Sequence, residues 1–143
     1  MANTTQVGTT TEGMVLAAIL KSGKTVLLPF GNQQDYDLVM EDGGCFYRIQ
    51  CKTGRLRQGS VQFNLYTMAQ EAGTGRHVRR HYGDKIDMYG VYCPEIEKTY
   101  LVPRSEVGVA VGILRVNPPG NNQSKNIRWA KDYEIKFAGV VQW

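Results

Sequence analysis

The fold is decided by the segment DYDLVMEDGGCFYRIQCK, which spans residues 35–52. Polar and apolar side chains alternate along its first part, so Tyr36, Leu38 and Met40 share one face of an extended strand. The sequence Asp42-Gly43-Gly44 then predicts a tight turn, because these residue types accept positive φ angles. Residues 45–52 alternate again and return as a second strand. The segment therefore predicts an antiparallel hairpin.

One face of this hairpin gathers groups suited to divalent-metal chemistry. Asp37 shares a face of the first strand with Asp35, and Gln50 and Lys52 share a face of the second strand. Mg²⁺ prefers hard oxygen ligands, and the backbone carbonyl of Cys51, between Gln50 and Lys52, is a further ligand of this kind. A nearby lysine can orient or deprotonate a metal-activated water. The pattern predicts metal-assisted phosphodiester cleavage.

A helix is expected ahead of the hairpin. Thr9-Thr10-Thr11-Glu12, placed before an apolar run, has the capping-box pattern, and Gly23 is a typical helix end. Residues 1–8 are polar, and we expect them to be flexible. If the helix packs on the hairpin, Glu12 comes close to Asp37. Glu12 therefore has two compatible interpretations, as a helix cap and as a member of the site.

The rest of the chain shows short strand signals separated by turns. Residues 66–85 are polar and basic and contain glycines, so we expect a loop with little regular structure. The order of one helix, strands in hairpins and then mixed elements indicates an α+β mixed-sheet fold, with a single domain over residues 1–143. Further strands are expected at Thr25–Leu28, Val61–Leu65, Ile86–Tyr92, Thr99–Val102 and Ile113–Val116, and short helical turns at Ser105–Val109 and Trp129–Tyr133.

Composition and charge narrow the function classes. The chain has 143 residues, of which 42% are hydrophobic and 21% charged, as in ordinary globular proteins. No apolar run approaches the ~18–20 residues of a membrane helix, and no signal-peptide pattern is present, so a cytoplasmic protein without membrane partners is expected. The three cysteines lack a C-x-x-C spacing, which argues against disulfides and structural zinc. Residues 48–85 contain eight Lys or Arg and two acidic residues, a net charge of +6, which favours a polyanion partner.

Several stretches together resemble a known family. Asp37 followed by Gln50-Cys51-Lys52, with Glu12 on a preceding helix, is similar to the PD-(D/E)XK nuclease pattern in its Q-x-K variant. Over residues 9–135 the chain resembles the group I intron-associated PD-(D/E)XK homing endonucleases. The stretches that carry this likeness are PFGN (29–32), YDL (36–38), QCKTGR (50–55), ID (86–87), YCP (92–94), NNQ (121–123) and IRWA (127–130).

The resemblance implies a fold and roles for individual residues. It implies a restriction-endonuclease-like α/β core, in which an N-terminal helix packs on a mixed sheet and the basic segment is a DNA-contacting insertion. Asp37 is then the principal metal carboxylate, Lys52 the motif lysine and Glu12 the helix glutamate. Gln50 stands where most of the superfamily has a second metal-site acid, so this site carries less charge. The long helix that usually follows the lysine strand is not evident. With the Cys51 carbonyl, these groups would hold Mg²⁺, with Mn²⁺ as a substitute.

The implied function is a Mg²⁺-dependent, site-specific endonuclease that cuts double-stranded DNA, encoded by a mobile intron. One small domain carries one active site, so cutting both strands requires a homo-oligomer, a dimer or a tetramer. We expect DNA contacts from residues of the basic segment and its turns, namely Arg55, Arg57, Gln58, Gln62, Arg76, His77, Arg79, Arg80 and Lys85.

Three other functions remain open. A Holliday junction resolvase would use the same residues on branched DNA, and a non-catalytic DNA-binding module would use the hairpin charges only structurally. A cysteine hydrolase would need Cys51 or Cys93 beside His77 or His81, but nothing in the sequence orients such a pair. The spacing of His77 and His81 also fits a helical metal pair, although the arginines around them favour phosphate contact or plain surface.

Overall fold

The computed structural model describes residues 3–121 and 125–137. Its first element is an 18-residue helix, α1 (Thr4–Lys21), which begins earlier than the expected start at Thr9. Asn3 is the N-cap: its side chain accepts a hydrogen bond from the backbone of Gln6, whose side chain binds back to the backbone of Asn3. Asn3 and Gln6 thus form the capping box that had been expected at Thr9 and Glu12.

The earlier helix start changes two interpretations. Residues 4–8, expected to be flexible, form the first turns of α1. Glu12 lies within the helix, so its capping role is excluded. The other end of α1 is as predicted, because Gly23 follows the cap with a φ of +89°.

A five-stranded mixed sheet carries the predicted hairpin. Its strand order is β1-β2-β3-β8-β9, in which β3 and β8 run parallel and the other neighbours antiparallel. The turn between β2 and β3 consists of Gly43 and Gly44, both with positive φ, as the sequence predicted. The strands are β1 (Thr25–Leu27), β2 (Leu38–Asp42), β3 (Cys45–Thr53), β8 (Met88–Cys93) and β9 (Lys98–Pro103).

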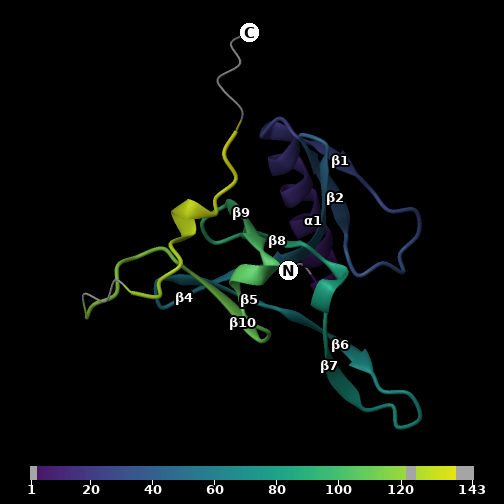
Figure 1. The fold of residues 1–143 in the computed structure, drawn as a ribbon. Coiled ribbons are helices and arrows are strands. Elements are labelled where there is room, and N and C mark those ends of the chain that lie inside the picture. The colour runs from purple at the N-terminus through teal and green to yellow at the C-terminus, as the bar shows by residue number, and fades with distance from the viewer. Residues whose placement is uncertain (1–2, 122–124, 138–143) are drawn as a thin grey trace.

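Helix α1 covers one face of this sheet (Figure 1). The apolar residues between helix and sheet include Val15 and Ile19 from the helix and Leu38 and Ile49 from the hairpin. The helix packs closely over β8, because a Cβ atom at Gly90 would lie 2.7 Å from Cγ1 of Val15. This close packing fixes the helix, and with it Glu12, against the strands.

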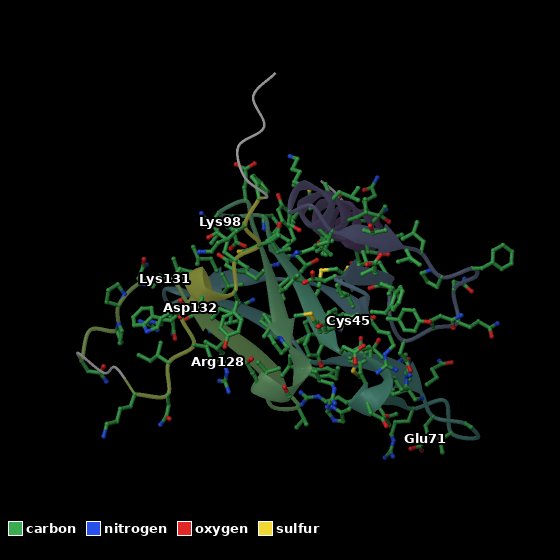
Figure 2. The ribbon with its side chains drawn as sticks, turned by 45° about the horizontal axis from the view of Figure 1, so that its top comes forward. Cys45, Glu71, Lys98, Arg128, Lys131 and Asp132 are labelled. Carbon is green, nitrogen blue, oxygen red and sulfur yellow. The ribbon has the colours of Figure 1, made fainter. Side chains whose placement is uncertain are left out.

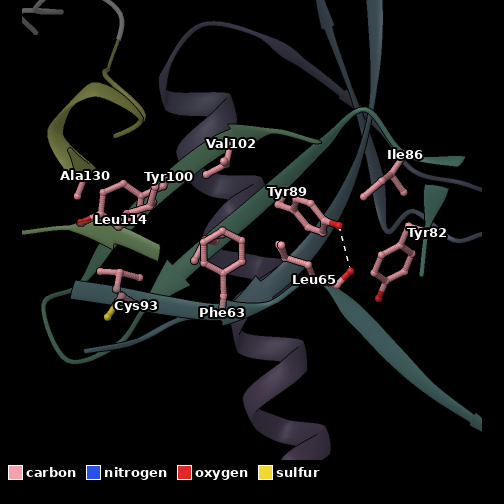
Figure 3. Packing of buried hydrophobic residues seen from close by; sticks show 12 residues of the cluster. Phe63, Leu65, Tyr82, Ile86, Tyr89, Cys93, Tyr100, Val102, Leu114 and Ala130 are labelled. Carbon is pink, nitrogen blue, oxygen red and sulfur yellow. Dashed lines mark hydrogen bonds between the residues drawn. The ribbon is translucent and has the colours of Figure 1, made fainter. Parts of the chain in front are cut away.

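A second, larger core fills the other face (Figure 3). Tyr89 and Tyr100 of the five-stranded sheet pack there with Phe63, Leu65 and Leu114. Phe63 and Leu114 lie on strands of a three-stranded sheet of order β10-β5-β4, and Leu65 directly follows one of those strands. Its strands are β4 (Arg55–Arg57), β5 (Ser60–Asn64) and β10 (Val111–Arg115).

The prediction of a loop with little regular structure at residues 66–85 is wrong. This stretch forms a separate two-stranded hairpin, β6 (Tyr66–Gln70) and β7 (His77–His81), which projects from the body of the molecule, followed by the short helix η1 (Gly83–Lys85). None of the ten residues in its two strands is buried, so no apolar alternation marks them in the sequence. Figure 2 shows Glu71 beside the turn of this hairpin, whereas Arg128, Lys131 and Asp132 lie on the C-terminal segment at the other side.

The remaining predicted elements are present with small shifts. The expected hairpin of Ile86–Tyr92 and Thr99–Val102 is β8 and β9, and the two helical turns are η2 (Arg104–Glu106) and η3 (Ala130–Asp132). Met1 and Ala2 of the expected flexible terminus, and Asn122 and Gln123 of the NNQ stretch, lie outside the described residues. Among the residues described, no helix has the length and apolar character needed to cross a membrane.

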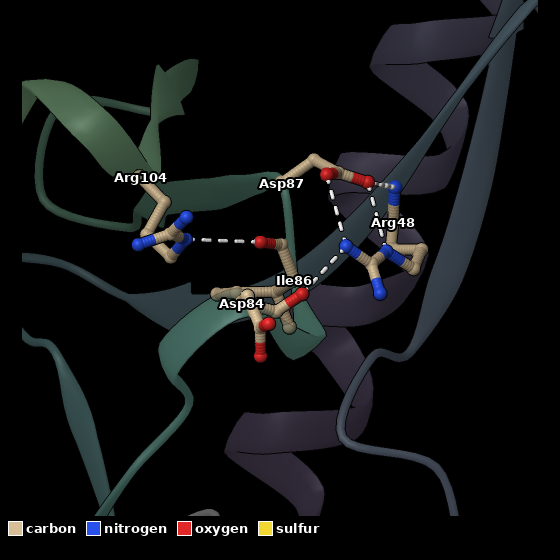
Figure 4. A network of polar contacts seen from close by, with 5 residues as sticks. All are labelled: Arg48, Asp84, Ile86, Asp87 and Arg104. Atoms are coloured by element: carbon tan, nitrogen blue, oxygen red, sulfur yellow. Dashed lines mark hydrogen bonds and ion pairs between the residues drawn. The ribbon is translucent and has the colours of Figure 1, made fainter.

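A polar network joins the start of β3 to the start of β8 (Figure 4). The carboxylate of Asp87 accepts hydrogen bonds from the backbone and the guanidinium of Arg48, at 2.8–3.1 Å. Arg48 also donates to the carbonyl of Asp84, and Arg104 donates to the carbonyl of Ile86. These bonds hold the parallel strands in the register that places Gln50 beside Tyr89.

Candidate active site

Asp37 is bound to the strand that carries Gln50 and Lys52. It lies just before β2, where its backbone N–H donates to the carbonyl of Ile49 at 2.8 Å. Its Oδ2 accepts a hydrogen bond from the backbone N–H of Cys51, also at 2.8 Å. The paired register of β2 and β3 ends at Leu38 and Ile49, and Asp37 reaches β3 through these two hydrogen bonds. The predicted hairpin therefore brings Asp37 to the strand segment that carries Gln50 and Lys52.

The Cys51 carbonyl has the orientation that the sequence analysis required. Within a strand, the N–H and C=O of one residue point to the same side. Since the N–H of Cys51 points to Asp37, its carbonyl is also directed to this edge, where β2 has not yet begun.

The thiol of Cys51 is buried against α1, and burial raises its pKa far above the ordinary value. Burial likewise raises the pKa of the Cys93 thiol. Since the thiolate is the reactive form, neither residue is suited to the role of a nucleophile. This geometry disfavours a cysteine hydrolase.

Glu12 and Asp37 line the same cleft. The helix is fixed to β3 beside Glu12 by a 2.6 Å hydrogen bond between the hydroxyls of Thr11 and Thr53. The cleft has a volume of about 370 Å³, and its remaining wall is the loop that follows β1, with Asn32 and Gln34 among its residues. Asn32 belongs to the PFGN stretch of the resemblance, but the sequence analysis assigned neither amide to the site.

The pKa values of both carboxylates in this cleft are raised. Partial burial raises the pKa of Glu12, and the neighbouring Asp37 carboxylate raises it further. Burial also raises the pKa of Asp37, although the Cys51 N–H and Lys52 act against this. Two carboxylates that disfavour each other's charge are stabilised by a cation placed near both.

The chemistry of the donor groups fits Mg²⁺ or Mn²⁺. Within the described ranges, no three side chains of His, Cys, Asp or Glu are grouped so as to hold a metal. The available set is instead oxygen-based: Oδ1 of Asp37, which makes no hydrogen bond within the part of the chain described, the carbonyl of Cys51 and the half-buried amide of Gln50. Hard divalent ions prefer such ligands and complete their shell with water and substrate oxygens.

Lys52 projects from β3 to the base of the β6–β7 hairpin. Its Nζ donates hydrogen bonds to the carbonyl of Tyr66 and the hydroxyl of Tyr82, each at 2.8 Å. Burial lowers its pKa to about 8, although Asp37 acts to raise it. No sequence signal links either tyrosine to Lys52.

The residues expected to contact DNA lie in two separate places. Arg55 and Gln62 are paired neighbours on β4 and β5, where they line a hollow of about 400 Å³ together with Arg57. Gln58 lies in the turn between these strands, with a φ of +52°. The other five residues, Arg76, His77, Arg79, Arg80 and Lys85, belong to the β6–β7 hairpin and η1.

Several of the hairpin's cations have partners within the protein. Arg76 pairs with Glu71 at 3.0 Å, and Arg79 lies over the ring of Tyr66, 4.4 Å from its centroid. Arg80 and Lys85 both pair with Asp35, at 2.6 and 3.5 Å. His77 and His81 lie on this exposed strand rather than on a helix, so the helical metal pair is excluded.

Comparisons with known proteins identify the family and the fold. A family model described as PD-(D/E)XK endonuclease matches residues 2–136. The structure is similar to that of a bacterial homing endonuclease, I-Ssp6803I, with a TM-score of 0.72 and 22% sequence identity over 93% of this chain and 89% of that one. No curated protein matches the sequence. At this identity the structural match shows a shared fold.

Proposed function

The chain belongs to the PD-(D/E)XK endonuclease family, and we propose that it is a Mg²⁺-dependent, site-specific endonuclease that cuts double-stranded DNA, of the kind encoded by mobile introns. The observation that carries this proposal is the hydrogen bond from Cys51 N–H to Asp37. It joins the carboxylate to the strand of Gln50 and Lys52, at a cleft that Glu12 also lines. A module that only binds DNA has no need for carboxylates at the edge of a basic surface.

In this proposal Asp37, the Cys51 carbonyl and Gln50 hold the metal, with Glu12 across the cleft. When bound, a divalent ion supplies charge neutralisation at the phosphate and acidifies water. Lys52 uses two of its N–H donors on Tyr66 and Tyr82, and a third donor is left for a phosphate oxygen or the attacking water. Asn32 and Gln34 offer further donors at the rim of the cleft.

Two surfaces are proposed to bind DNA. The face of β4 and β5 presents Arg55, Arg57 and Gln62, side-chain types that recognise guanine and adenine edges in the major groove. Gln58 extends this face at its turn. The β6–β7 hairpin presents the basic residues of the second surface, which suit phosphate contacts.

One cleft of this kind cuts one strand. We therefore propose a homo-oligomer, a dimer or tetramer, in which symmetry places a second cleft on the other strand. We also propose that the protein acts on DNA in the cytoplasm.

The test is digestion of a supercoiled plasmid that carries an intron-free insertion site, with Mg²⁺, with Mn²⁺ and with EDTA. We expect linear product with either metal and none with EDTA, and no product from Asp37→Asn. Cleavage of a synthetic four-way junction but not of the plasmid would instead indicate a resolvase. If the protein binds the duplex but cleaves it under none of these metal conditions, it would instead be a non-catalytic DNA-binding module.

A further inference from the structure

The amino group of Lys52 is held by one projecting element. Its two hydrogen-bond acceptors are the carbonyl of Tyr66, the first residue of β6, and the hydroxyl of Tyr82, which directly follows β7. Both therefore belong to the base of the β6–β7 hairpin, although they lie 14 and 30 residues from Lys52 in the chain. The lysine's position thus depends on the base of this hairpin.

Tyr82 is built into the core on the side away from Lys52. Its side chain is 4% exposed, and its ring makes an edge contact with the ring of Tyr89, with centroids 6.1 Å apart. This contact needs only the Tyr89 ring, because the Tyr89 hydroxyl points elsewhere and donates to the carbonyl of Leu65 at 3.2 Å (Figure 3). Lys52 Nζ lies 4.8 Å from the centroid of the Tyr82 ring, so the ring as well as the hydroxyl attracts the ammonium.

The hairpin is attached to the other half of the site as well. Asp35, two residues before Asp37, accepts ion pairs from Arg80 at the end of β7 and from Lys85 in η1. The Asp35 side chain is only 14% exposed, so these contacts are partly shielded from solvent. Both segments that carry the site are therefore joined to the base of the hairpin.

From these contacts we propose that Tyr82 is a positioning residue for Lys52. With the Tyr66 carbonyl, its hydroxyl holds two N–H donors of the ammonium and so leaves the third for the substrate. The inference rests on the proposed nuclease function, because it assigns Lys52 its task there. It adds that the hairpin proposed to contact DNA also fixes the place of this lysine.

Two matched variants test this role. Tyr82→Phe keeps the ring and removes the hydroxyl that binds Lys52, whereas Tyr89→Phe removes a buried hydroxyl that binds a backbone carbonyl. We expect single-turnover cleavage of the plasmid by Tyr82→Phe to be roughly 10- to 100-fold slower, since a misplacement of about 1 Å costs on that order. Its affinity for the same duplex should be unchanged, and Tyr89→Phe should cut at nearly the wild-type rate.

A second measurement does not depend on activity. In protein labelled with ¹⁵N-lysine, the Nζ signal of Lys52 should change in Tyr82→Phe and stay in place in Tyr89→Phe. The inference would be overturned by unchanged cleavage in Tyr82→Phe or by equal losses of cleavage in both variants. It would also be overturned by a Lys52 Nζ signal that is the same in Tyr82→Phe as in the wild type. A wild-type protein that cuts no DNA would refute the proposed function itself and remove this inference with it.

Discussion

Replacement of Asp37 should separate stability from activity. Asp37→Asn keeps the shape of the side chain and an oxygen that can accept the Cys51 N–H, but it removes the negative charge. Asp37→Ala removes the acceptor as well. We expect both variants to lose cleavage, because each lacks the carboxylate proposed to hold the metal. Relative to the wild type, their stabilities should change in opposite directions.

The structure gives the sign and size of each change. In Asp37→Ala the Cys51 N–H loses its partner, and an unsatisfied, partly buried donor costs about 1–3 kcal/mol. In a chain of this size that corresponds to a fall in Tm of roughly 3–10 °C. In Asp37→Asn the hydrogen bond remains, while an unfavourable charge is lost. Burial raises the pKa of Asp37, and Glu12 faces it with a second carboxylate, so the metal-free protein should become more stable.

The assay is thermal and urea unfolding of the three proteins in EDTA at neutral pH, beside plasmid cleavage in Mg²⁺. We expect the order of stability Asn, wild type, Ala, with cleavage only by the wild type. The reasoning is refuted if Asp37→Asn is as unstable as Asp37→Ala, since the charge would then be favourable in the folded state. Cleavage by either variant at the wild-type rate would remove Asp37 from the site.

Three further predictions follow from the site and its supports. Gln50→Glu adds a carboxylate beside Cys51, whose N–H binds Asp37, so calorimetric titration without DNA should show tighter Mn²⁺ binding than in the wild type; equal affinities would mean that residue 50 is not a ligand. Arg48 holds the pKa of Asp87 below its usual range, so the stability of this pair is fully present above about pH 4 and is lost as pH falls through the lowered pKa. Urea unfolding from pH 6 to 2 should therefore lose less stability in Asp87→Asn than in the wild type, and parallel curves would contradict the assignment. Arg79→Gln, on the hairpin proposed to contact phosphates, should reduce the slope of log K against log salt by about 0.9 if the side chain neutralises one phosphate, as measured by duplex binding at several salt concentrations; an unchanged slope would exclude that contact.

The hairpin of β2 and β3 was predictable because its information is local. Alternation placed Leu38 and Ile49 in the core, and the two glycines marked the turn, so the approach of Asp37 to the strand of Gln50 and Lys52 followed from the hairpin itself. The resemblance based on these residues is confirmed at the level of the PD-(D/E)XK endonuclease family. The helix start was missed because Asn3 and Gln6 offer the same capping pattern as Thr9 and Glu12, and local sequence does not rank the two.

What the sequence could not show depends on contacts between distant segments. The β6–β7 hairpin has solvent on both faces, so no period marks it, and its attachment to the site runs through Asp35, 45 residues from Arg80. The parallel pairing of β3 with β8, on which the Arg48–Asp87 network depends, leaves no local signal either. Tyr82 lies in a basic stretch where a tyrosine suggests DNA stacking as readily as a bond to Lys52.

The neutral residue at position 50 has a physical explanation in this arrangement. Glu12 and Asp37 already oppose each other's ionisation across the cleft. A third carboxylate near Asp37 would add like charge to a site where Lys52 is the cation that lowers the pKa of Asp37. An amide offers the metal an oxygen without that repulsion, but also without the attraction of a full charge. The missing negative charge can then come from a DNA phosphate, so we expect metal to bind more tightly to the protein–DNA complex than to the protein alone.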